Sequence, residues 1–281
     1  FGFLADNGGG TMRIDDGASA CFLQSTKQST NGTRLFFLIT GTPRQIMHGY
    51  HTVTGFPPMP PLWALGFLHS EWGVDENKIK ERARTYRQKD IPVDAFILDF
   101  EWMDWGNPDG EFKWNPIIFP GAMNGTLRDT MNLAGIKIMG IRKPRIHTET
   151  PAGAFCEQQN WFVSKDEDYW SEKEVGNLNF DIPACRRWYW NKFIDPAYNS
   201  YQRGIVAYWN DEGGYGNFQN FHWQQGQYEG QLALNNLRVF SLNRSYFAGA
   251  QRYAYGLWSG DIRTGFDVQA TQRLEMLKSI C

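Results

Sequence analysis

The stretch Ile205–Phe218, IVAYWNDEGGYGNF, begins like a buried β-strand and changes character within a few residues. Apolar and aromatic residues lead into two adjacent acids, Asp211 and Glu212, which two glycines follow. Loop chemistry alone explains such a sequence, because Asp and Gly favour turns and acids cap helices. A rigid strand that ends on carboxylates is also a good position for a catalytic acid. The remainder of the chain decides between these two interpretations.

Segments on both sides of this stretch alternate between strand and helix patterns. Short apolar runs predict strands at residues 62–67, 95–100, 136–141, 205–209, 239–243 and 254–258. Helical periodicity predicts helices at residues 76–90, 127–135, 185–194, 228–237 and 268–279, with a long irregular stretch before residue 185. Apolar strands that alternate with helices are typical of parallel β/α folds. Both a doubly wound sheet and a (β/α)8 barrel fit this pattern.

Residues 1–56 have a different pattern from the rest of the chain. FGFLAD and TRLFFLIT are strand-like, and turns rich in Gly, Asp, Ser and Thr separate them. Four prolines then occur within residues 57–61. Because proline fixes φ and lacks an amide donor, this segment predicts a stiff linker and a domain boundary. We therefore predict a β-rich domain at 1–56 and an α/β domain at 57–281.

Composition argues against several functional classes. The 28 basic and 30 acidic residues leave a net charge of −2, which gives no electrostatic case for binding nucleic acid. No apolar run reaches the roughly 18 residues that a membrane-spanning helix requires. The four cysteines and five histidines show no CxxC, HxH or HExxH spacing, so we predict no metal and no other cofactor. The high aromatic share, 16%, fits a large core, a site that stacks sugar rings, or both.

Polar and aromatic side chains follow each predicted strand. In a (β/α)8 barrel such residues would meet, because the active site lies at the C-terminal ends of the strands. In chain order they are His69, Glu71 and Trp72; Asp99, Glu101, Trp102 and Asp104; Arg142 and Lys143; Asp211 and Glu212; Asn243 and Arg244; and Trp258, Ser259 and Asp261. Carboxylates among tryptophans suit glycoside hydrolysis, in which one acid attacks the anomeric carbon and another protonates the leaving oxygen.

The chain resembles glycoside hydrolase family 31, the retaining exo-α-glycosidases, along its whole length. The motifs that carry the resemblance are PPLWALGF (60–67), DIPVDAFILDFEWMD (90–104), FKWNPIIFP (112–120), GNLNFDIPACRRWYW (176–190), GIVAYWNDEGG (204–214) and NRSYFAGAQRYAYGLWSGD (243–261). The last motif is long and specific, and it resembles the family's run that carries the acid/base. The resemblance implies a (β/α)8 barrel that hydrolyses a terminal α-linked sugar of an oligosaccharide or glycoside.

The resemblance also implies roles for individual residues. It makes Asp211 the nucleophile and Asp261 the general acid/base. Arg252 matches a sugar-contacting arginine. The remaining residues that we expect to bind substrate are Asp99, Glu101, Trp102, Lys143, Trp209 and Trp258. Glu212 is expected to be a neighbour of the nucleophile without a role of its own.

Several positions depart from the family pattern. Glu212-Gly213-Gly214 stands where the family commonly has Met-Asn-Glu, and Glu101 stands where it commonly has aspartate. Lys143 introduces a cation where α-glucosidases are often neutral or acidic, unless it simply forms a salt bridge to Asp99 or Glu101. An α-glucosidase-like activity is therefore expected, with α-galactosides and α-N-acetylgalactosaminides as further substrates to consider. A transglycosidase, or a non-catalytic sugar-binding relative, would retain the same fold.

The sequence predicts only part of a barrel. Six barrel strands are present, whereas the family's barrel has eight, and the first 56 residues resemble the end of an N-terminal β-sandwich domain. We therefore expect an incomplete (β/α)8 domain from a larger enzyme, with the remaining strands after Cys281. An open six-stranded sheet has two unpaired edges, so it is expected to be unstable alone.

Overall fold

The computed structural model describes residues 2–6, 11–15, 20–24, 35–198, 200–201, 203–212, 219–244 and 248–258. Contacts divide the chain into two compact units, Phe1–Phe56 and Pro57–Cys281, and the division falls at the proline-rich segment. The helix predicted at residues 268–279 and the proposed acid/base Asp261 lie outside the described residues. No helix in the described part of the chain is long and apolar enough to cross a membrane.

The described residues of the first unit form two antiparallel strand pairs and one helix. Its strands are β1 (Gly2–Asp6) paired with β4 (Leu35–Ile39), and β2 (Thr11–Asp15) paired with β3 (Ala20–Gln24). The helix α1 (Pro43–Thr54) is an element that the strand-based prediction missed. Its signal is a capping box, in which the amide of Gln45 donates to Thr42 and the amide of Thr42 donates to the Gln45 side chain. The assignment of this unit to a β-sandwich stays a prediction.

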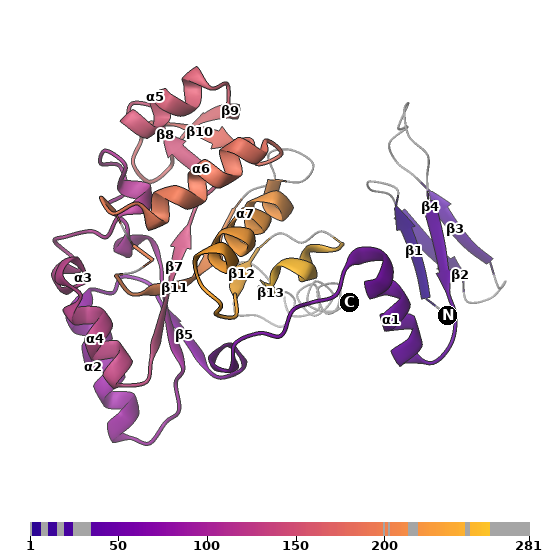
Figure 1. Cartoon of the computed structure of the whole chain (residues 1–281), viewed down its shortest axis with the longest axis horizontal. Helices are drawn as coiled ribbons and strands as arrows, with labels where there is room; N and C mark the ends of the chain where they lie inside the picture. The colour runs from indigo at the N-terminus through magenta and orange to yellow at the C-terminus, as the bar shows by residue number, and fades with distance from the viewer. Residues whose placement is uncertain are drawn as a thin grey trace. The chain divides into compact units, whose positions relative to one another are not determined.

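A parallel sheet of six strands forms the framework of the second unit (Figure 1). Its strands are β5 (Leu68–Glu71), β6 (Ala95–Leu98), β7 (Lys137–Arg142), β11 (Ile205–Asn210), β12 (Ser241–Asn243) and β13 (Tyr255–Leu257). Each strand pairs in parallel with the next strand of this sheet along the chain. A doubly wound sheet would reverse its order at a switch point, whereas a barrel does not. The prediction of a (β/α)8-type barrel fold is therefore confirmed, with six of its strands among the described residues.

Helices and short 3₁₀ turns precede or connect these strands. They are η1 (Leu62–Leu65), α2 (Glu76–Gln88), η2 (Phe100–Trp102), η3 (Gly110–Phe112), α3 (Pro120–Asn124), α4 (Thr126–Leu133), α6 (Pro183–Ile194), α7 (Gln219–Leu234) and η4 (Ala250–Tyr253). The helix α2 packs against α4, and α6 packs against α7. Aromatic rings fill the space between sheet and helices; the buried ones include Trp102, Trp114, Tyr189, Tyr208 and Trp223. Much of the aromatic content therefore belongs to the core.

The first strand begins later than predicted. The apolar run 62–67 contains η1, and β5 starts only at Leu68. Leu62, Leu65 and Phe67 are exposed, so this run is apolar without being buried. Periodicity alone cannot separate such a run from a strand, and the preceding proline at position 61 is the signal for an irregular start.

A small antiparallel sheet occupies the segment that was predicted to be irregular. It consists of β8 (Arg145–His147), β9 (Phe162–Glu167) and β10 (Glu174–Leu178), with β10 in the centre. The helix α5 (Pro151–Gln158) is capped by Thr150, whose side chain accepts a hydrogen bond from the Gly153 amide. The prediction was wrong here because the strands are short and largely polar. Their register depends on contacts that are distant in the sequence.

Candidate active site

The C-terminal ends of the parallel strands are joined by backbone hydrogen bonds. The amide of Asp211, just after β11, donates to the carbonyl of Arg142 at the end of β7 (3.3 Å). The amide of Trp258, just after β13, donates to the carbonyl of Asn243 at the end of β12 (3.0 Å). These bonds fix the register at the strand ends, so the side chains that follow the strands are held near one another.

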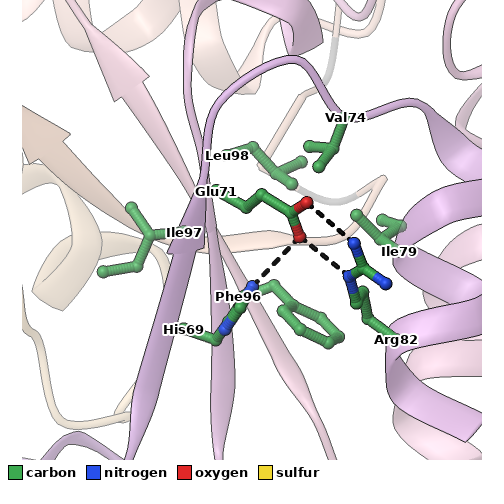
Figure 2. Close-up of a pocket in the computed structure, with 8 residues that line it drawn as sticks. All are labelled: His69, Glu71, Val74, Ile79, Arg82, Phe96, Ile97 and Leu98. Carbon is green, nitrogen blue, oxygen red and sulfur yellow. Dashed lines mark hydrogen bonds and ion pairs between the residues drawn. The ribbon is translucent and has the colours of Figure 1, made fainter. Parts of the chain in front are cut away.

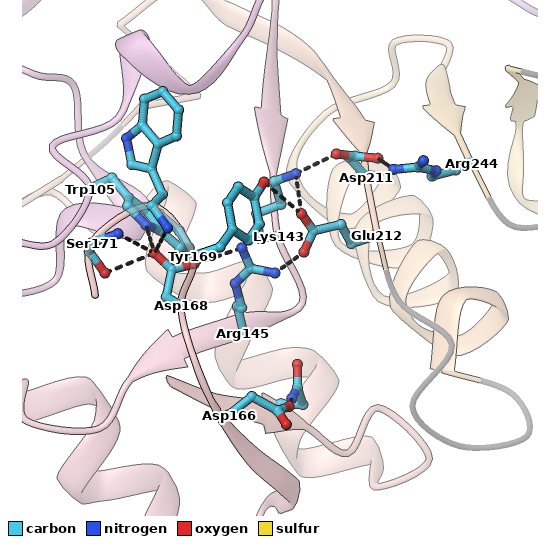
Figure 3. Close-up of polar contacts among 12 residues, drawn as sticks. Trp105, Lys143, Arg145, Asp166, Asp168, Tyr169, Ser171, Asp211, Glu212 and Arg244 are labelled. Carbon is cyan, nitrogen blue, oxygen red and sulfur yellow. Dashed lines mark hydrogen bonds and ion pairs between the residues drawn. The ribbon is translucent and has the colours of Figure 1, made fainter. Parts of the chain in front are cut away.

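Asp211 is the centre of an ion-pair cluster at these strand ends (Figure 3). Its side chain is buried, with 6% of the residue exposed. The Lys143 ammonium donates to Oδ2, and Nη1 of Arg244 donates to Oδ1 at 3.1 Å. The two cations fix the orientation of the carboxylate at the tip of β11.

Lys143 pairs with different acids from those considered in the sequence analysis. Its ammonium binds Asp211 and also donates to Oε1 of Glu212 at 2.9 Å, whereas the sequence analysis considered Asp99 and Glu101. The Phe100 ring lies 4.5 Å from Nζ. Burial lowers the pKa of Lys143, and the neighbouring Asp211 carboxylate opposes that change. Lys143 is therefore bound to the acid proposed as nucleophile.

Glu212 has a structural role that the sequence analysis did not assign. Its backbone adopts φ 63°, in the left-handed region that is uncommon for residues other than glycine. In this conformation its carboxylate bridges two cations, because Oε1 contacts Lys143 and Oε2 contacts Arg145. The Tyr169 hydroxyl also donates to Oε1 (3.1 Å). Glu212 thus connects the end of β11 to the small antiparallel sheet.

Arg145 and Asp168 extend the cluster away from Asp211 (Figure 3). Nη2 of Arg145 donates to Oδ1 of Asp168 at 2.8 Å. Oδ2 of Asp168 accepts hydrogen bonds from the Trp105 indole (3.0 Å) and from the Ser171 amide (2.7 Å). Burial alone would raise the pKa of Asp168, but these hydrogen bonds and Arg145 hold it below its usual value. The sequence signal for this part of the cluster was the run RKPR at residues 142–145, which begins on the last residue of β7 and has three cations in four residues.

Asp99 and Glu101 lie just after β6, near Asp211. Oδ1 of Asp99 accepts a hydrogen bond from the Phe100 amide (2.8 Å), which starts the turn η2. Burial raises the pKa of Asp99 to about 6, and the negative charges of Glu101 and Asp211 add to this effect. Oε1 of Glu101 accepts from the Gly73 amide (2.8 Å), whereas its Oε2 is buried and has no hydrogen-bond partner among the described residues.

The elevated pKa of Asp99 predicts a pH-dependent stability. Between its ordinary value of 3.8 and about 6, the folded protein binds more protons at Asp99 than the unfolded chain, so this residue makes the protein less stable as pH rises through that window. Relative to wild type, Asp99→Asn should gain up to about 3 kcal/mol in unfolding free energy between pH 4 and pH 7.5. Denaturant unfolding at both pH values measures this gain.

The exposed Asp129→Asn variant on α4 supplies the matched loss of one negative charge. The difference in unfolding free energy between wild type and Asp99→Asn is corrected with this control. If the corrected difference is the same at both pH values, the fold does not hold the Asp99 carboxyl in its protonated form.

Trp209 and Trp258 form one wall beside Asp211. Their rings meet edge to face with centroids 4.9 Å apart, and the Arg244 guanidinium lies 5.1 Å from the Trp258 ring centroid. The indole nitrogen of Trp209 is buried and finds no acceptor in the described part of the chain. A buried donor without a partner is costly, and it is commonly explained by an absent water or ligand.

Trp102 and Arg252 do not join this cluster in the structure. Trp102 is completely buried, with 0% exposed, and its indole donates to the Ile141 carbonyl (2.7 Å). The turn η2 directs this ring into the core. Arg252 is exposed in η4, where its Nε donates to the Gly249 carbonyl (3.2 Å) and its guanidinium lies over Phe221 and Tyr253. The roles that the resemblance implies for these two residues stay predictions.

Arg142 lies on the opposite side of the strand end from Lys143. Successive residues of a strand point to opposite faces, and Arg142 points toward α6 and α7. Its guanidinium donates to Asn210 (2.6 Å) and Gln227 (2.7 Å), and rings of Tyr189, Phe193, Tyr208 and Trp223 surround it. Burial lowers the pKa of Arg142 to about 10. Arg142 therefore supports the strand ends from the side of α6 and α7, and it is not part of the surface that faces Asp211.

The polar residues of the first strand are bound to the helix α2 (Figure 2). Glu71 accepts two hydrogen bonds from Arg82, at 2.9 and 3.0 Å, and these lower the pKa of Glu71 to about 2. His69 contacts both Glu71 (3.3 Å) and the Tyr86 hydroxyl (2.9 Å). His69, Glu71 and Arg82 line a small cavity between β5, β6 and α2. Their mutual pairing gives them a structural role at the sheet edge.

No group of three or more His, Cys, Asp or Glu side chains among the described residues could hold a metal ion. The groups that the structure brings together at the strand ends are carboxylates, cations and indoles. A buried carboxylate with flanking cations can attack an electrophilic carbon, and the neighbouring acids and indole can bind hydroxyl groups.

The sheet and the acidic cluster at its strand ends together define a (β/α)8-barrel domain with a polar site at the expected face. The family model "Glycosyl hydrolases family 31 TIM-barrel domain" matches residues 57–279, and the chain belongs to this family. The family assignment made from sequence is confirmed.

Relatives with established names support the same assignment. The chain is 35% identical over 290 residues to the 1,6-alpha-glucosyltransferase of Sporosarcina globispora, covering 93% of this chain and 22% of the relative. It is 28% identical to human Neutral alpha-glucosidase C, covering 83% of this chain and 29% of the relative. Among solved structures, a GH31 alpha-xylosidase from a soil metagenome, complexed with xylose, superposes with a TM-score of 0.75 at 22% identity, covering 86% of this chain and 38% of that one. The chain thus spans less than a third of the length of the glucosyltransferase and of Neutral alpha-glucosidase C.

Proposed function

We propose that the protein is a retaining exo-α-glycosidase or α-transglycosidase in which Asp211 is the nucleophile. The observation that carries this proposal is a buried carboxylate at the tip of β11, oriented by Lys143 and Arg244 in a domain of family 31. Fixed charges of the protein replace most of the water that would otherwise solvate this carboxylate. The carboxylate is therefore held ready to attack.

The proposed reaction has two displacements. An oxygen of Asp211 bonds to the anomeric carbon while the bond from that carbon to the leaving oxygen breaks, and the leaving oxygen takes a proton from Asp261. In the second step a water or sugar hydroxyl gives its proton to Asp261 and attacks the anomeric carbon, and Asp211 departs as a carboxylate. The role of Asp261 rests on the resemblance alone. A retaining enzyme requires about 5–5.5 Å between the two carboxyl groups.

Unpaired polar atoms support a sugar-binding site beside Asp211. Oε2 of Glu101 lacks a donor and Nε1 of Trp209 lacks an acceptor among the described residues. A sugar hydroxyl both donates and accepts, so hydroxyl groups of one ring can satisfy both atoms. Asp99 supplies a further polar group that is largely shielded from solvent. We propose that these three residues bind the terminal sugar.

An α-glucoside is the substrate that we propose. Two named relatives, a 1,6-alpha-glucosyltransferase and a neutral alpha-glucosidase, point to it. Their names also support both outcomes of the second step, transfer and hydrolysis. Glu101 and Lys143 depart from the family pattern, so α-galactosides and α-N-acetylgalactosaminides belong in the same test. A non-catalytic sugar-binding protein is the alternative.

Covalent labelling tests this proposal directly. The full-length protein should hydrolyse α-glucosyl fluoride, and incubation with 5-fluoro-α-glucosyl fluoride should add one glycosyl group to the peptide that contains Asp211. Peptide mass spectrometry identifies the labelled residue, and the galactosyl reagents serve as the parallel arm. An adduct on a different carboxylate would reject Asp211. A folded protein that binds sugars but neither turns over nor becomes labelled would favour the non-catalytic alternative.

A further inference from the structure

Lys143 is bound by two carboxylates at the strand ends, and only one of them belongs to the proposed nucleophile. Its ammonium donates to Oδ2 of Asp211 and to Oε1 of Glu212, the second at 2.9 Å. Among the described residues, these two acids form the ion pairs of Lys143. Only 1% of the Lys143 side chain is exposed, so water contributes little to the solvation of its charge. The two carboxylates therefore take the place of water around the ammonium.

The first step of the proposed reaction changes this balance of charge. One oxygen of Asp211 bonds to the anomeric carbon, and the carboxylate becomes a neutral ester. The leaving oxygen takes the electron pair of the broken bond and a proton from Asp261. Lys143 keeps its positive charge but loses the attraction of the Asp211 carboxylate. A buried cation without a paired carboxylate is costly, so a second acid beside Lys143 would stabilise the glycosyl-enzyme.

Glu212 is held in a position where it supplies that second negative charge. With its backbone at φ 63°, its carboxylate contacts both Lys143 and Arg145 (Figure 3). Arg145 is in turn fixed by Asp168, with Nη2 of the arginine 2.8 Å from Oδ1 of the aspartate. None of these contacts involves Asp211. They can therefore persist while Asp211 is an ester.

The other cation that binds Asp211 has a more exposed environment. Nη1 of Arg244 donates to Oδ1 of Asp211, and 36% of the Arg244 side chain is exposed. When the ester forms, water can replace part of the interaction that Arg244 loses, because exposed charges are well solvated. Water cannot do so at the buried Lys143. The requirement for a second carboxylate is therefore strongest at Lys143, where Glu212 lies.

We propose that Glu212 is a positioning residue that balances the charge of Lys143 while the sugar is bound covalently to Asp211. This inference rests on the proposed function. In the free enzyme, Lys143 orients the Asp211 carboxylate for attack. As the ester forms, the ammonium pairs with Glu212 alone, and it pairs with Asp211 again when water or a sugar hydroxyl releases that carboxylate. Glu212 thereby stabilises the intermediate and the transition state that leads to it, and it acts through Lys143.

The two steps of the reaction should respond differently to Glu212→Gln, which removes the charge and keeps the shape of the side chain. The first step should slow about tenfold, measured as the rate constant for inactivation of the full-length protein by 5-fluoro-α-glucosyl fluoride. The second step is measured as the recovery of activity after the excess reagent has been removed. It should be as fast as in wild type or faster, because the variant destabilises the intermediate itself. A general loss of structure at the site would slow both steps.

Two further variants separate the charge of Glu212 from its other contacts. Tyr169→Phe removes the hydroxyl that donates to Oε1 of Glu212 at 3.1 Å but leaves the charge, so both rates should stay within about threefold of wild type. Glu212→Asp keeps the charge and should be inactivated faster than Glu212→Gln. The inference is wrong if Glu212→Gln does not slow the first step more than the second, or if Glu212→Asp is inactivated no faster than Glu212→Gln. If the reagent does not label the wild-type protein at all, the proposed function itself fails and this inference falls with it.

Discussion

Asp211→Asn should abolish turnover, with kcat reduced about 10⁴-fold or more on every substrate that the wild-type protein accepts. The amide is nearly isosteric with the carboxylate, but it cannot form the glycosyl ester on which both steps depend. Steady-state rates on α-glucosyl fluoride measure the loss. The matched control is Glu212→Gln, which changes the adjacent carboxylate in the same way and should reduce kcat much less.

Azide determines which acid performs which role. In Asp211→Gly, azide can enter the space of the missing carboxylate and displace the leaving group once, which inverts the anomeric centre and gives a β-glycosyl azide. In Asp261→Gly, azide attacks the glycosyl-enzyme ester and gives an α-glycosyl azide with net retention. Proton NMR of the products distinguishes the anomers. The reverse assignment of products, or rescue of neither variant, would contradict the roles that we propose.

Lys143→Met should cause the second large effect, a loss of about 3–5 kcal/mol in unfolding free energy at pH 7. The ammonium is almost fully buried and binds both Asp211 and Glu212. Methionine has a similar volume, so the substitution removes the charge and leaves a well-filled space. Two largely buried carboxylates then face each other with one fewer cation. Denaturant unfolding of the full-length protein measures the loss.

Two further variants isolate the cause. Lys165→Met removes a lysine of β9 that forms an exposed ion pair with Glu157 of α5, and it should leave the unfolding midpoint nearly unchanged. The combination Lys143→Met with Asp211→Asn should recover part of the loss, because one of the unpaired charges is gone. If Lys143→Met is as stable as wild type, or if the combination is no more stable than Lys143→Met alone, then the pairing with Asp211 does not stabilise the fold.

The sequence was sufficient to predict the parallel sheet, but it was not sufficient to predict where each strand begins. Apolar runs at 95–100, 136–141 and 205–209 are buried on both faces, which is why their pattern was clear. The run 62–67 was equally apolar but exposed, and periodicity did not separate the two cases; only the proline at position 61 indicated an irregular start. The small sheet β8–β10–β9 could not be predicted, because its polar strands are stabilised by partners up to about 30 residues away.

The sequence predicted where the acids of the candidate site lie, but it did not predict which residues pair with them. Asp211 and Asp99 follow apolar strands, and their position follows from strand polarity in a barrel. The partners of Lys143 depend on side-chain direction, so sequence proximity to the acids of β6 was misleading. Trp102 shows the same difficulty, since the 3₁₀ turn after β6 rotates its ring into the core. Glu212 could be assigned its bridging role only once β8 placed Arg145 opposite it.

The guanidinium of Arg142 has a consequence for protein engineering. Arg142 and Lys143 point to opposite sides at the end of β7. The hydrogen bonds and ring contacts of Arg142 described above all come from β11, α6 or α7. Substitutions at positions such as Gln227 or Trp223, chosen only to improve helix packing, would therefore shift the base of the catalytic face. Libraries that aim to alter sugar preference should keep Arg142 and the residues that surround it unchanged. They should instead vary residues on the opposite side of the strand ends, where Lys143 lies. Variation there leaves intact the packing behind β11, the strand that leads to Asp211, the proposed nucleophile.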